Sequence, residues 1–326
     1  MSHPDLSDPI FNNENAARKH LESLIWKDGR YCPHCGSTEE SRPIRGKKHR
    51  DGMYYCNACK KQFTVTVGTL YESSHVALHK WLLATHLLCS SKKGISSHQL
   101  HRMIGVTYKT AWFMTHRIRE AMRPVDPQPM GGSGQTVEVD ETYWGPMPEI
   151  FMNPTDGRPG GWRRKSGTKE KMKILTLVER DGQARSFHIP NVKSATLRAV
   201  LHRHLKRDTH LMTDEFNAYK SIGLRFITHR TVNHSAKEYV RGASHTNTIE
   251  NFFSIFKRGL TGTYQHISEK HLKRYLCEFD FRYNERTALK VDDHMRRDKA
   301  LTGIKGKRMT YQQPRGGKAS ESALLP

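Results

Sequence analysis

The sequence has 326 residues, and its Lys and Arg residues exceed Asp and Glu so far that the formal net charge is +22 at pH 7. Such an excess predicts a polyanionic partner; we expect nucleic acid, with an anionic membrane surface as the alternative. No apolar run approaches the ~18 residues of a transmembrane helix, and residues 1–9 lack the basic start and apolar core of a secretory signal. We therefore expect a cytoplasmic protein of two or three domains, with no membrane as partner.

The chain is expected to begin with an amphipathic helix over residues 14–26, which carries Leu21 and Ile25 on its apolar face. Asn13 is the expected N-cap, because an Asn side chain accepts a hydrogen bond from the first turn of a helix. We assign residues 1–27 to an N-terminal helical segment.

Two CxxC pairs follow, and 20 residues separate them. Each pair turns the backbone so that both sulfurs face one ion, and the spacing fits the upper edge of the four-thiolate zinc template. Four thiolates complete the coordination of the metal, so the expected zinc is structural and not catalytic. Two unrelated cysteine pairs, or a redox-active CxxC, are the alternatives. We assign residues 28–70 to a zinc ribbon with the ligands Cys32, Cys35, Cys56 and Cys59.

Residues 71–123 read as a helical region, preceded by a strand-like alternation at 63–67. A helix is predicted at 76–89, and a short helix ending at Gly105 is followed at once by a longer one. Two helices joined by a tight Gly turn are typical of a helix-turn-helix, whose second helix enters the major groove of DNA. An ordinary helical hairpin is the alternative, but the charge and the zinc ribbon favour DNA binding. The residues expected at the bases open the second helix: Thr107, Tyr108, Lys109 and Thr110.

Pro and Gly dominate residues 124–134, as is typical of a linker. Beyond it, residues 135–290 predict an α/β domain with a mixed sheet. Its strands are expected at 135–143, 172–179, 184–189, 209–213 and 226–232, and its helices at 194–205, 216–222, 246–260 and 270–284.

Two basic segments of this half of the chain are expected to lack regular structure. Residues 157–168 read as a mobile loop, and its basic residues Arg163, Arg164 and Lys165 are candidates for DNA binding. Residues 291–326 read as a basic, disordered tail, because apolar residues are few there.

Three acidic residues occupy special points of the α/β pattern. Asp140 and Asp214 each end an apolar run of strand type, and Glu250 lies within a helical pattern 35 residues after Asp214. Three carboxylates make an all-oxygen site, which suits Mg²⁺ or Mn²⁺ and not zinc. Two such ions can clamp the attacking and leaving oxygens of a phosphodiester. Any one of these carboxylates alone is better explained as a helix cap, so the interpretation depends on their combination.

The order of these elements resembles the ribonuclease-H-like fold of the DDE transposases and integrases. The VDET of residues 139–142, the HTNTIE of residues 245–250 and the preceding zinc ribbon resemble, more closely, the bacterial insertion-sequence transposases of the IS1595 family. The resemblance covers nearly the whole chain, from about residue 15 to residue 284, and its motifs are specific only when taken together.

The resemblance implies that Asp140, Asp214 and Glu250 are the catalytic carboxylates and hold two Mg²⁺ or Mn²⁺ ions. Lys257 lies seven residues after Glu250. That spacing puts both side chains on one helix face. The resemblance implies that Lys257 contacts DNA there, and Arg258 is a further candidate for DNA binding.

The third metal ligand has an alternative. Some members of the family use Asn there, and Asn247 lies one turn before Glu250, with His245 nearby as a secondary site residue. Glu141 and Glu215 are expected to lie outside the ligand set, because adjacent side chains of a strand point to opposite faces.

The function implied by the resemblance is that of a DNA transposase. Such an enzyme binds insertion-sequence ends, cleaves DNA by metal-dependent hydrolysis and joins the 3′-hydroxyl ends to target DNA by transesterification. The expected partners are double-stranded DNA and further copies of the chain, as a homodimer or larger homo-oligomer. The alternatives are a zinc-ribbon DNA-binding regulator with an inactive catalytic domain, and a nuclease of the same fold without strand transfer.

Overall fold

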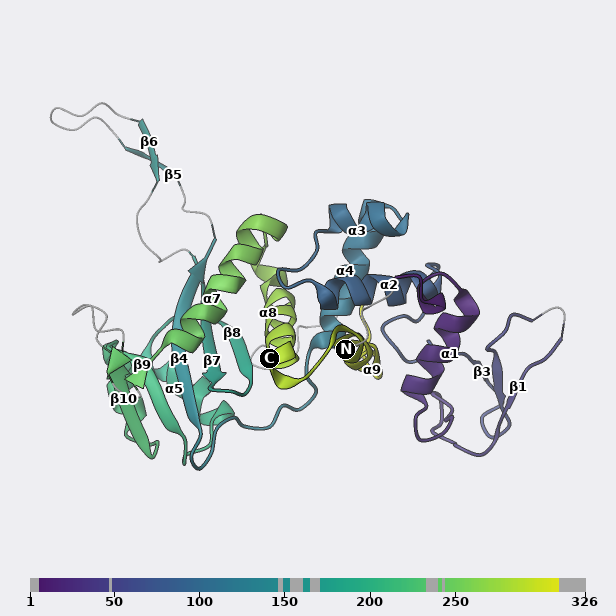
Figure 1. The fold of residues 1–326 in the computed structure, drawn as a ribbon, viewed down its shortest axis with the longest axis horizontal. Coiled ribbons are helices and arrows are strands. Elements are labelled where there is room, and N and C mark those ends of the chain that lie inside the picture. The colour runs from purple at the N-terminus through teal and green to yellow at the C-terminus, as the bar shows by residue number, and fades with distance from the viewer. Residues whose placement is uncertain are drawn as a thin grey trace. The chain divides into compact units, whose positions relative to one another are not determined.

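A computed structural model describes residues 6–46, 49–145, 149–152, 161–164, 171–232, 240–241 and 244–310. The chain divides into two compact units, which Figure 1 shows by colour along the chain. The first unit combines Met1–Val125 with Glu285–Pro326, and the second is Asp126–Asn284. The boundary at Val125 falls inside the segment that the sequence predicts as a linker. No helix in the described ranges has the length and apolar character needed to cross a bilayer.

The first unit opens with η1 (Pro9–Phe11) and α1 (Glu14–Ile25). The side chain of Asn13 accepts the Ala16 N–H at 3.0 Å, which confirms the predicted N-cap. Leu21 and Ile25 are four residues apart and are both buried. One apolar stripe of the helix therefore faces the core of the unit.

A small antiparallel sheet follows, formed by β1 (Ser41–Pro43), β2 (Tyr54–Cys56) and β3 (Gln62–Phe63) in that order. The strand expected at residues 63–67 is wrong beyond Phe63. The Val67 N–H donates to the Thr64 carbonyl at 3.1 Å, and the hydroxyls of Thr64 and Thr66 bond each other at 2.9 Å. Such local hydrogen bonds of Thr favour turns over strands.

The helical region contains α2 (Leu78–Ser90), α3 (Ser97–Ile104) and α4 (Tyr108–Met122). Ser96 caps α3, Thr107 caps α4, and Gly105 ends α3 in the left-handed conformation at φ 62°. A side chain at that φ would be strained, so the tight connection between α3 and α4 depends on glycine.

The C-terminal residues correct the predicted tail. η5 (Thr287–Leu289) is followed by α9 (Asp293–Thr302), which packs against α1, α2 and α4. The prediction of a disordered tail is therefore wrong up to residue 310, and residues 311–326 lie outside the described part. Apolar residues are few here, but Ala300, Leu301 and Ile304 share one buried face. Their spacing of three and four residues, and not their number, decides the outcome.

The second unit is built on a five-stranded sheet in the order β10-β9-β4-β7-β8. β4, β7 and β8 pair antiparallel, whereas β9 pairs parallel to β4, and β10 parallel to β9. This pairing confirms the predicted mixed sheet. The strands are β4 (Thr136–Trp144), β7 (Met172–Glu179), β8 (Ala184–Ile189), β9 (His210–Asp214) and β10 (Thr228–Val232).

Helices cover both faces of this sheet. On one face, Val137 and Val139 of β4 share a core with Leu197 and other residues of α5 (Ser194–His204). Close by on that side are η2 (Asn217–Tyr219) and α6 (Lys220–Gly223), which contact α5. On the other face, Ile174 and Val178 of β7 pack with α7 and α8. The bounds here are α7 (Asn247–Gly259), the π-helical turn η4 (Leu260–Tyr264) and α8 (Glu269–Asn284).

Two short strand pairs complete the unit. β5 (Glu149–Met152) pairs antiparallel with β6 (Gly161–Arg164), and β11 (Val240–Arg241) with β12 (Ser244–His245). Residues 161–164 belong to the segment that the sequence predicts as a mobile loop, so that expectation is wrong for these four residues. Its partner β5, at residues 149–152, was not predicted from the sequence.

The packing of the C-terminal segment predicts a large effect of Lys307→Met. The Lys307 ammonium is buried and donates to the carbonyls of Glu120, Ala121 and Arg123 at 3.0, 3.1 and 2.5 Å. Those carbonyls end α4 and would lose their donor, which costs about 1–3 kcal/mol. Urea denaturation should show this loss in the free energy of unfolding, whereas Arg308→Met at an exposed position should shift it by less than about 0.5 kcal/mol. Equal effects of the two substitutions would contradict this role of Lys307.

Candidate active site and metal centres

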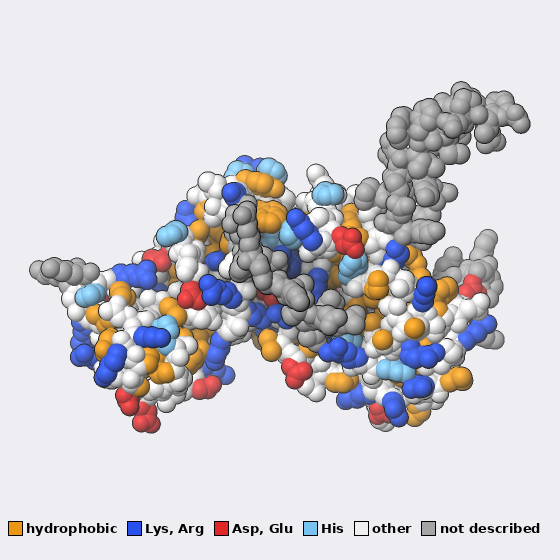
Figure 2. Space-filling view, turned by 180° about the vertical axis from the view of Figure 1, so that it is seen from behind, with side chains coloured by type: hydrophobic (Ala, Val, Ile, Leu, Met, Phe, Trp, Pro, Cys, Tyr) orange, Lys and Arg blue, Asp and Glu red, His pale blue; other side chains and the backbone are white. Residues whose placement is uncertain are grey.

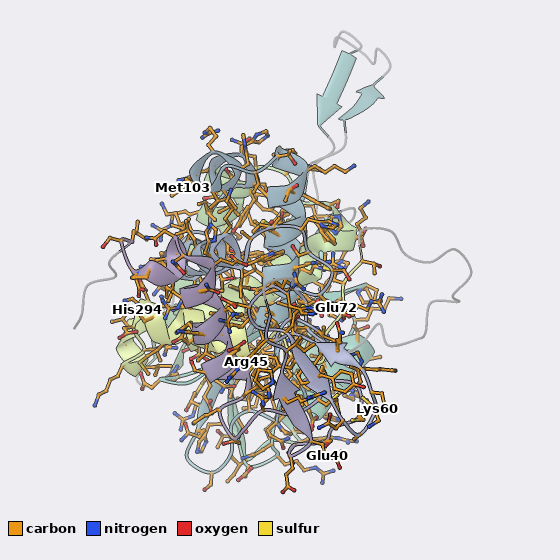
Figure 3. All side chains as sticks on the ribbon, turned by 90° about the vertical axis from the view of Figure 1, so that its right-hand side faces the viewer. Glu40, Arg45, Lys60, Glu72, Met103 and His294 are labelled. Atoms are coloured by element: carbon orange, nitrogen blue, oxygen red, sulfur yellow. The ribbon has the colours of Figure 1, made fainter. Side chains whose placement is uncertain are left out.

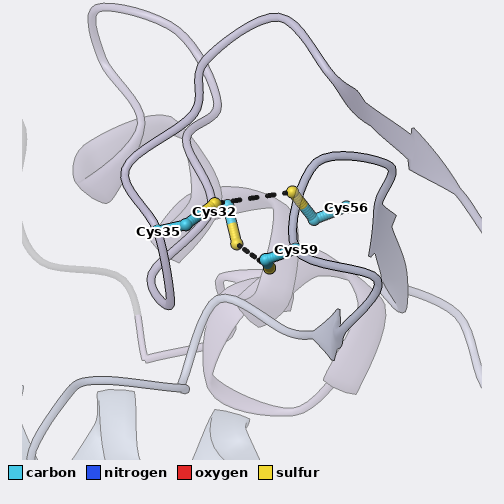
Figure 4. A group of neighbouring side chains, drawn as sticks. All are labelled: Cys32, Cys35, Cys56 and Cys59. Atoms are coloured by element: carbon cyan, nitrogen blue, oxygen red, sulfur yellow. Dashed lines mark hydrogen bonds between the residues drawn. The ribbon is translucent and has the colours of Figure 1, made fainter.

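The four cysteines of the CxxC pairs come together between the loop before β1 and the ends of β2 and β3. Their sulfurs all lie within 4.8 Å of one another, with 3.7 Å from Cys32 to Cys59 and from Cys35 to Cys56 (Figure 4). Zinc bound tetrahedrally at about 2.3 Å per sulfur requires sulfur–sulfur distances of about 3.8 Å. The residues therefore fit a structural zinc ion. Cys89 on α2 and Cys277 on α8 are buried elsewhere and take no part.

The backbone forms the same turn at each cysteine pair. The Gly36 N–H donates to the Cys32 carbonyl at 2.8 Å, and the Lys60 N–H donates to the Cys56 carbonyl at 2.9 Å. Gly36 and Lys60 both have positive φ, at 80° and 59°. The pKa of the Cys56 thiol is lowered to about 7, mainly because the backbone N–H of Cys59 points to its sulfur. Burial, in contrast, raises the pKa of the Cys59 thiol to about 12. The turns thus bring the four sulfurs together, and the N–H groups favour the thiolate form at Cys56 in particular. Arg45 and Lys60, labelled in Figure 3, are basic side chains of this ribbon.

The second site lies where β9 ends at Asp214, beside Asp140 in the middle of β4, which continues in pairing with β7 to Trp144. Their parallel register pairs Thr136 with His210 and Glu138 with Met212. Asp140 and Asp214 each lie two residues beyond the last of these pairs. Because neighbouring strands lie about 4.8 Å apart, continuation of the register brings these two residues close together.

The charges around Asp140 show which groups gather there. Its pKa is raised to about 7, first by burial and then by the negative charges of Asp214 and Glu250. The Glu141 N–H, which donates to Asp140 Oδ1 at 2.7 Å, and the Lys257 ammonium act in the opposite direction. Among the described residues, only the four cysteines hold three or more possible ligand atoms within 4.8 Å of one another. The three carboxylates thus share one electrostatic neighbourhood but form a looser group than the sulfurs.

Of the two neighbouring glutamates, Glu141 follows the strand alternation, whereas Glu215 lies beyond the end of β9. Glu141 points to the α5 face of the sheet, where its carboxylate accepts a hydrogen bond from the buried hydroxyl of Tyr219. Burial raises the pKa of Glu141 to about 8, against the lowering effect of the Tyr219 hydroxyl. Glu215 is exposed, in the middle of the Asx-type turn in which Asp214 Oδ1 accepts the Phe216 N–H at 3.0 Å.

The exposed face of α7 carries the remaining residues implied by the resemblance. Asn247, Glu250, Lys257 and Arg258 are all exposed, and the Thr246 hydroxyl donates to Glu250 Oε1 at 3.1 Å. The opposite face of α7 is buried through Ile249, Phe252, Phe253 and Phe256. Burial of that aromatic stripe fixes the rotation of the helix, which turns Glu250 and Lys257 outward together.

One residue of this site was missed by sequence reasoning. The side chain of Glu138 is 0 % exposed and accepts hydrogen bonds from Arg180 Nε, the Thr248 hydroxyl and the Ile249 N–H, at 2.7, 3.0 and 2.9 Å. A signal was available: Glu138 stands between two valines of a strand pattern, and a charged residue inside such a pattern is rarely buried without partners.

In the first unit, the residues expected to read DNA bases begin α4. Tyr108 and Lys109 are exposed, and the Tyr108 ring stacks on His98 of α3 with 4.1 Å between ring centroids. Thr107 accepts the Thr110 N–H at 3.2 Å, and the two hydroxyls bond each other at 2.8 Å. Both threonines therefore use their side chains in capping α4, which leaves Tyr108 and Lys109 as the side chains that point outward. Met103 of α3 is also exposed (Figure 3).

For three further candidate site residues, only the position in a strand is described. Arg163 and Arg164 lie on β6, in register with Ile150 and Glu149 of β5. His245 ends β12, in register with Val240. Lys165 lies outside the described residues.

The raised pKa values predict how the metal-free protein responds to pH. Asp140 and Glu141 hold protons up to about 7 and about 8 when folded, whereas their ordinary values are 3.8 and 4.5. The unfolded chain releases these protons first, so this contribution to stability is complete below about pH 4 and is lost as the pH rises through 7 to 8.

Asp140→Asn removes the contribution of Asp140 to the pH dependence of stability, because an Asn side chain does not titrate. In urea denaturation with a chelator that spares the zinc, the variant should lose less stability than the wild type between about pH 5 and pH 8. Glu215→Gln, at an exposed position, is the matched control and should decline with the wild type. An equally steep decline of Asp140→Asn would show that Asp140 does not titrate in this range.

Comparisons with known proteins agree with this arrangement. A family model described as the ISXO2-like transposase domain matches residues 131–284, and one described as the transposase zinc-ribbon domain matches residues 12–62. A protein of the transposable element ISH50 from Halobacterium salinarum is 31 % identical over 278 residues, which cover 83 % of this chain and 91 % of the relative. A transposase-like protein of Haemophilus influenzae is 32 % identical over 114 residues, or 35 % of this chain and 83 % of its own length.

Among solved structures, the Mos1 strand transfer complex matches 70 % of this chain and 79 % of its own chain, at 11 % identity and a TM-score of 0.27. That score is too low to support a conclusion about the fold. The identity with the ISH50 protein along almost its whole length, together with the two family matches, establishes the relationship. The chain belongs to the IS1595 family of insertion-sequence transposases.

Proposed function

We propose that the second unit is a DDE catalytic domain of the ribonuclease-H-like fold, in which Asp140, Asp214 and Glu250 are the catalytic carboxylates. The observation that carries the proposal is the gathering of negative charge around Asp140 of β4, on which Asp214 and Glu250 both act. The strand order supports it, since a hairpin-linked β4, β7 and β8 is extended beyond β4 by two parallel strands. That is the order of elements expected from the resemblance to this fold.

The donor set fits hard divalent cations. All three side chains offer oxygen. Burial, and after it the negative charges of Asp214 and Glu250, raise the pKa of Asp140, and a bound cation would offset both effects. Two Mg²⁺ or Mn²⁺ ions, when bound, would neutralise the phosphodiester, lower the pKa of the attacking oxygen and stabilise the leaving oxygen. Asp140 and Asp214 would hold them from the sheet, and Glu250 from α7.

The reaction supported best is DNA cleavage followed by joining. Water attacks the phosphorus and the P–O3′ bond breaks, which frees a 3′-hydroxyl at the element end. That hydroxyl then attacks a phosphodiester of target DNA, and a second 3′-hydroxyl leaves. Each step exchanges one P–O bond for another, so no covalent bond between protein and DNA is needed. Lys257 and Arg258, exposed on α7, would hold DNA phosphates beside the carboxylates.

The DNA itself is proposed to be held partly by the first unit. In this view α3, Gly105 and α4 form a helix-turn-helix, with Tyr108 and Lys109 at the base edges. Lys and Arg side chains are spread widely over the face seen in Figure 2, whereas Asp and Glu side chains are few there. With a net charge of +22, electrostatic attraction to phosphate would act over the whole molecule. We expect the active complex to be a homodimer or larger homo-oligomer on double-stranded DNA.

One experiment separates this function from its alternatives. The protein is incubated with Mg²⁺ and labelled duplexes made from the DNA that flanks its coding sequence, together with a plasmid as target. A transposase yields mapped 3′ ends and then joined products. A nuclease of the same fold yields cut ends alone, and a regulator binds the duplexes without cutting them.

The identity of the third metal ligand is tested by comparing substitutions of Glu250 and Asn247 on α7. Glu250→Gln should abolish cleavage and joining and leave binding to the element ends nearly intact, because a neutral amide binds Mg²⁺ more weakly than a carboxylate. Asn247→Ala is the control one turn earlier and should retain Mn²⁺-supported cleavage. Normal cutting by Glu250→Gln with an inactive Asn247→Ala would assign the third ligand to Asn247 instead.

Lys109 tests the base-reading role of α4. Lys109→Ala should weaken binding to the element ends more than binding to random duplex of equal length, since base contacts carry sequence preference and phosphate contacts do not. Losing one good base contact is worth about 1–3 kcal/mol of discrimination. Gel-shift titrations at one fixed salt concentration measure both affinities. Equal losses on both duplexes would make Lys109 a phosphate contact.

A further inference from the structure

We propose that Glu138 is a positioning residue of the active site, which caps α7 from the neighbouring strand β4 and thereby sets the place of Glu250 relative to Asp140. This inference rests on the proposed function, because it concerns the same three carboxylates. Glu138 itself touches none of the reacting groups in this scheme.

The first step of the argument is the missing cap of α7. The N-cap residue Thr246 makes no side-chain capping bond, and its hydroxyl donates to Glu250 instead. The first N–H groups of a helix have no acceptor within the helix and need one from outside. Glu138 Oε2 fills this need by accepting the N–H of Ile249, the third residue of α7, at 2.9 Å.

The second step concerns the charge of Glu138. A carboxylate at a helix N-terminus is favoured by the helix dipole, and charge-assisted hydrogen bonds are stronger than neutral ones. Arg180 Nε at 2.7 Å and the Thr248 hydroxyl at 3.0 Å both donate to Glu138 Oε1, so the buried charge is paired. A buried carboxylate with three donors is held in one orientation.

The third step is the position of this bond in the site. Glu138 and Asp140 are two residues apart on β4 and so point to the same face of the sheet. Ile249 is the residue before Glu250. One hydrogen-bonded link therefore joins the residue next to Glu250 on α7 to the residue that precedes Asp140 on the same face of β4. Catalytic groups tolerate displacements of only about 0.5 Å, so the link fixes a distance on which the site depends.

The chain offers a closely matched control in Glu278 of α8. Its side chain is also 0 % exposed, it is paired with an arginine, Arg282, and it also accepts a hydroxyl, that of Tyr264. These partners belong to α8 and η4, so none of these bonds reaches β4 or the first turn of α7. Glu278→Gln removes a buried, paired charge from the same helical layer without touching the link.

The test uses the full-length, zinc-loaded protein and two readouts that need no DNA. Mn²⁺ alone is titrated and followed by electron paramagnetic resonance, and amide hydrogen exchange is measured without Mn²⁺. Glu138→Gln should weaken Mn²⁺ binding about 10- to 100-fold, as loss of a residue that orients metal ligands does. Exchange over residues 247–250 should quicken by about tenfold or more, because the Ile249 N–H loses its charged acceptor.

Glu278→Gln should leave Mn²⁺ binding and amide hydrogen exchange at residues 247–250 within about twofold of the wild type. This should hold even if Glu278→Gln lowers the melting temperature as much as Glu138→Gln does. Equal effects of the two variants, or unchanged Mn²⁺ binding in Glu138→Gln, would overturn the inference. If Glu138→Gln does not fold, Thr248→Val provides the test, because it removes only one of the donors to Glu138. It should weaken Mn²⁺ binding and speed amide exchange at residues 247–250, both by less than Glu138→Gln. Mn²⁺ binding and exchange equal to those of the wild type would contradict the link.

Asp140→Asn separates failure of this inference from failure of the proposed function. If it binds Mn²⁺ as the wild type does, the carboxylate site itself is not a metal site. If it loses Mn²⁺ binding while Glu138→Gln keeps it, the site stands and only the positioning role of Glu138 is refuted.

Discussion

The parallel pairing of β4 with β9 is the constraint on which the second unit depends. It places two strands that are far apart in the sequence side by side, with Asp140 and Asp214 each two residues beyond the last pair of their register. The antiparallel pairing of β4 with β7 then fixes which side chains face each helical layer. Once Ile174 and Val178 are covered by the aromatic face of α7, Glu250 has only a narrow range of positions. The acidic group is thus a consequence of register and packing, both of which are set by apolar residues.

Much of this arrangement could be predicted because it follows from periodicity. Alternating apolar residues located the five strands of the sheet, and the capping residues Asn13 and Gly105 marked helix ends. Asp140 and Glu141 were separated correctly by strand alternation alone, since Glu141 faces Tyr219 on the other side of the sheet. Alternation does not give the distances between elements. The sequence therefore could not show that the three carboxylates are spaced more widely than the four sulfurs.

Two features were not predicted from the sequence, each for a different physical reason. Glu138 was overlooked because its importance arises from partners 42 and 110 residues away, Arg180 and Thr248, which meet only in the folded unit. The helix α9 was overlooked because low apolar content suggested disorder, although a few well-spaced residues suffice to bury one stripe. Buried cations strengthen that helix: Arg296 Nε donates to the Glu285 carbonyl at 2.8 Å, and its Nη1 to the Cys89 carbonyl at 3.2 Å. Average composition counts such residues as polar, whereas the folded unit uses them as internal hydrogen-bond donors.

The first unit is made from two stretches of chain, with the whole second unit inserted between them. During synthesis, the ribosome therefore completes the second unit before it releases α9, which packs against α1, α2 and α4. The partially made chain would carry the zinc ribbon and the α3–α4 pair on an incomplete core until its last residues emerge. A product terminated early would consequently lack the helix that completes the core of the first unit, and its zinc ribbon and α3–α4 pair would be less stable.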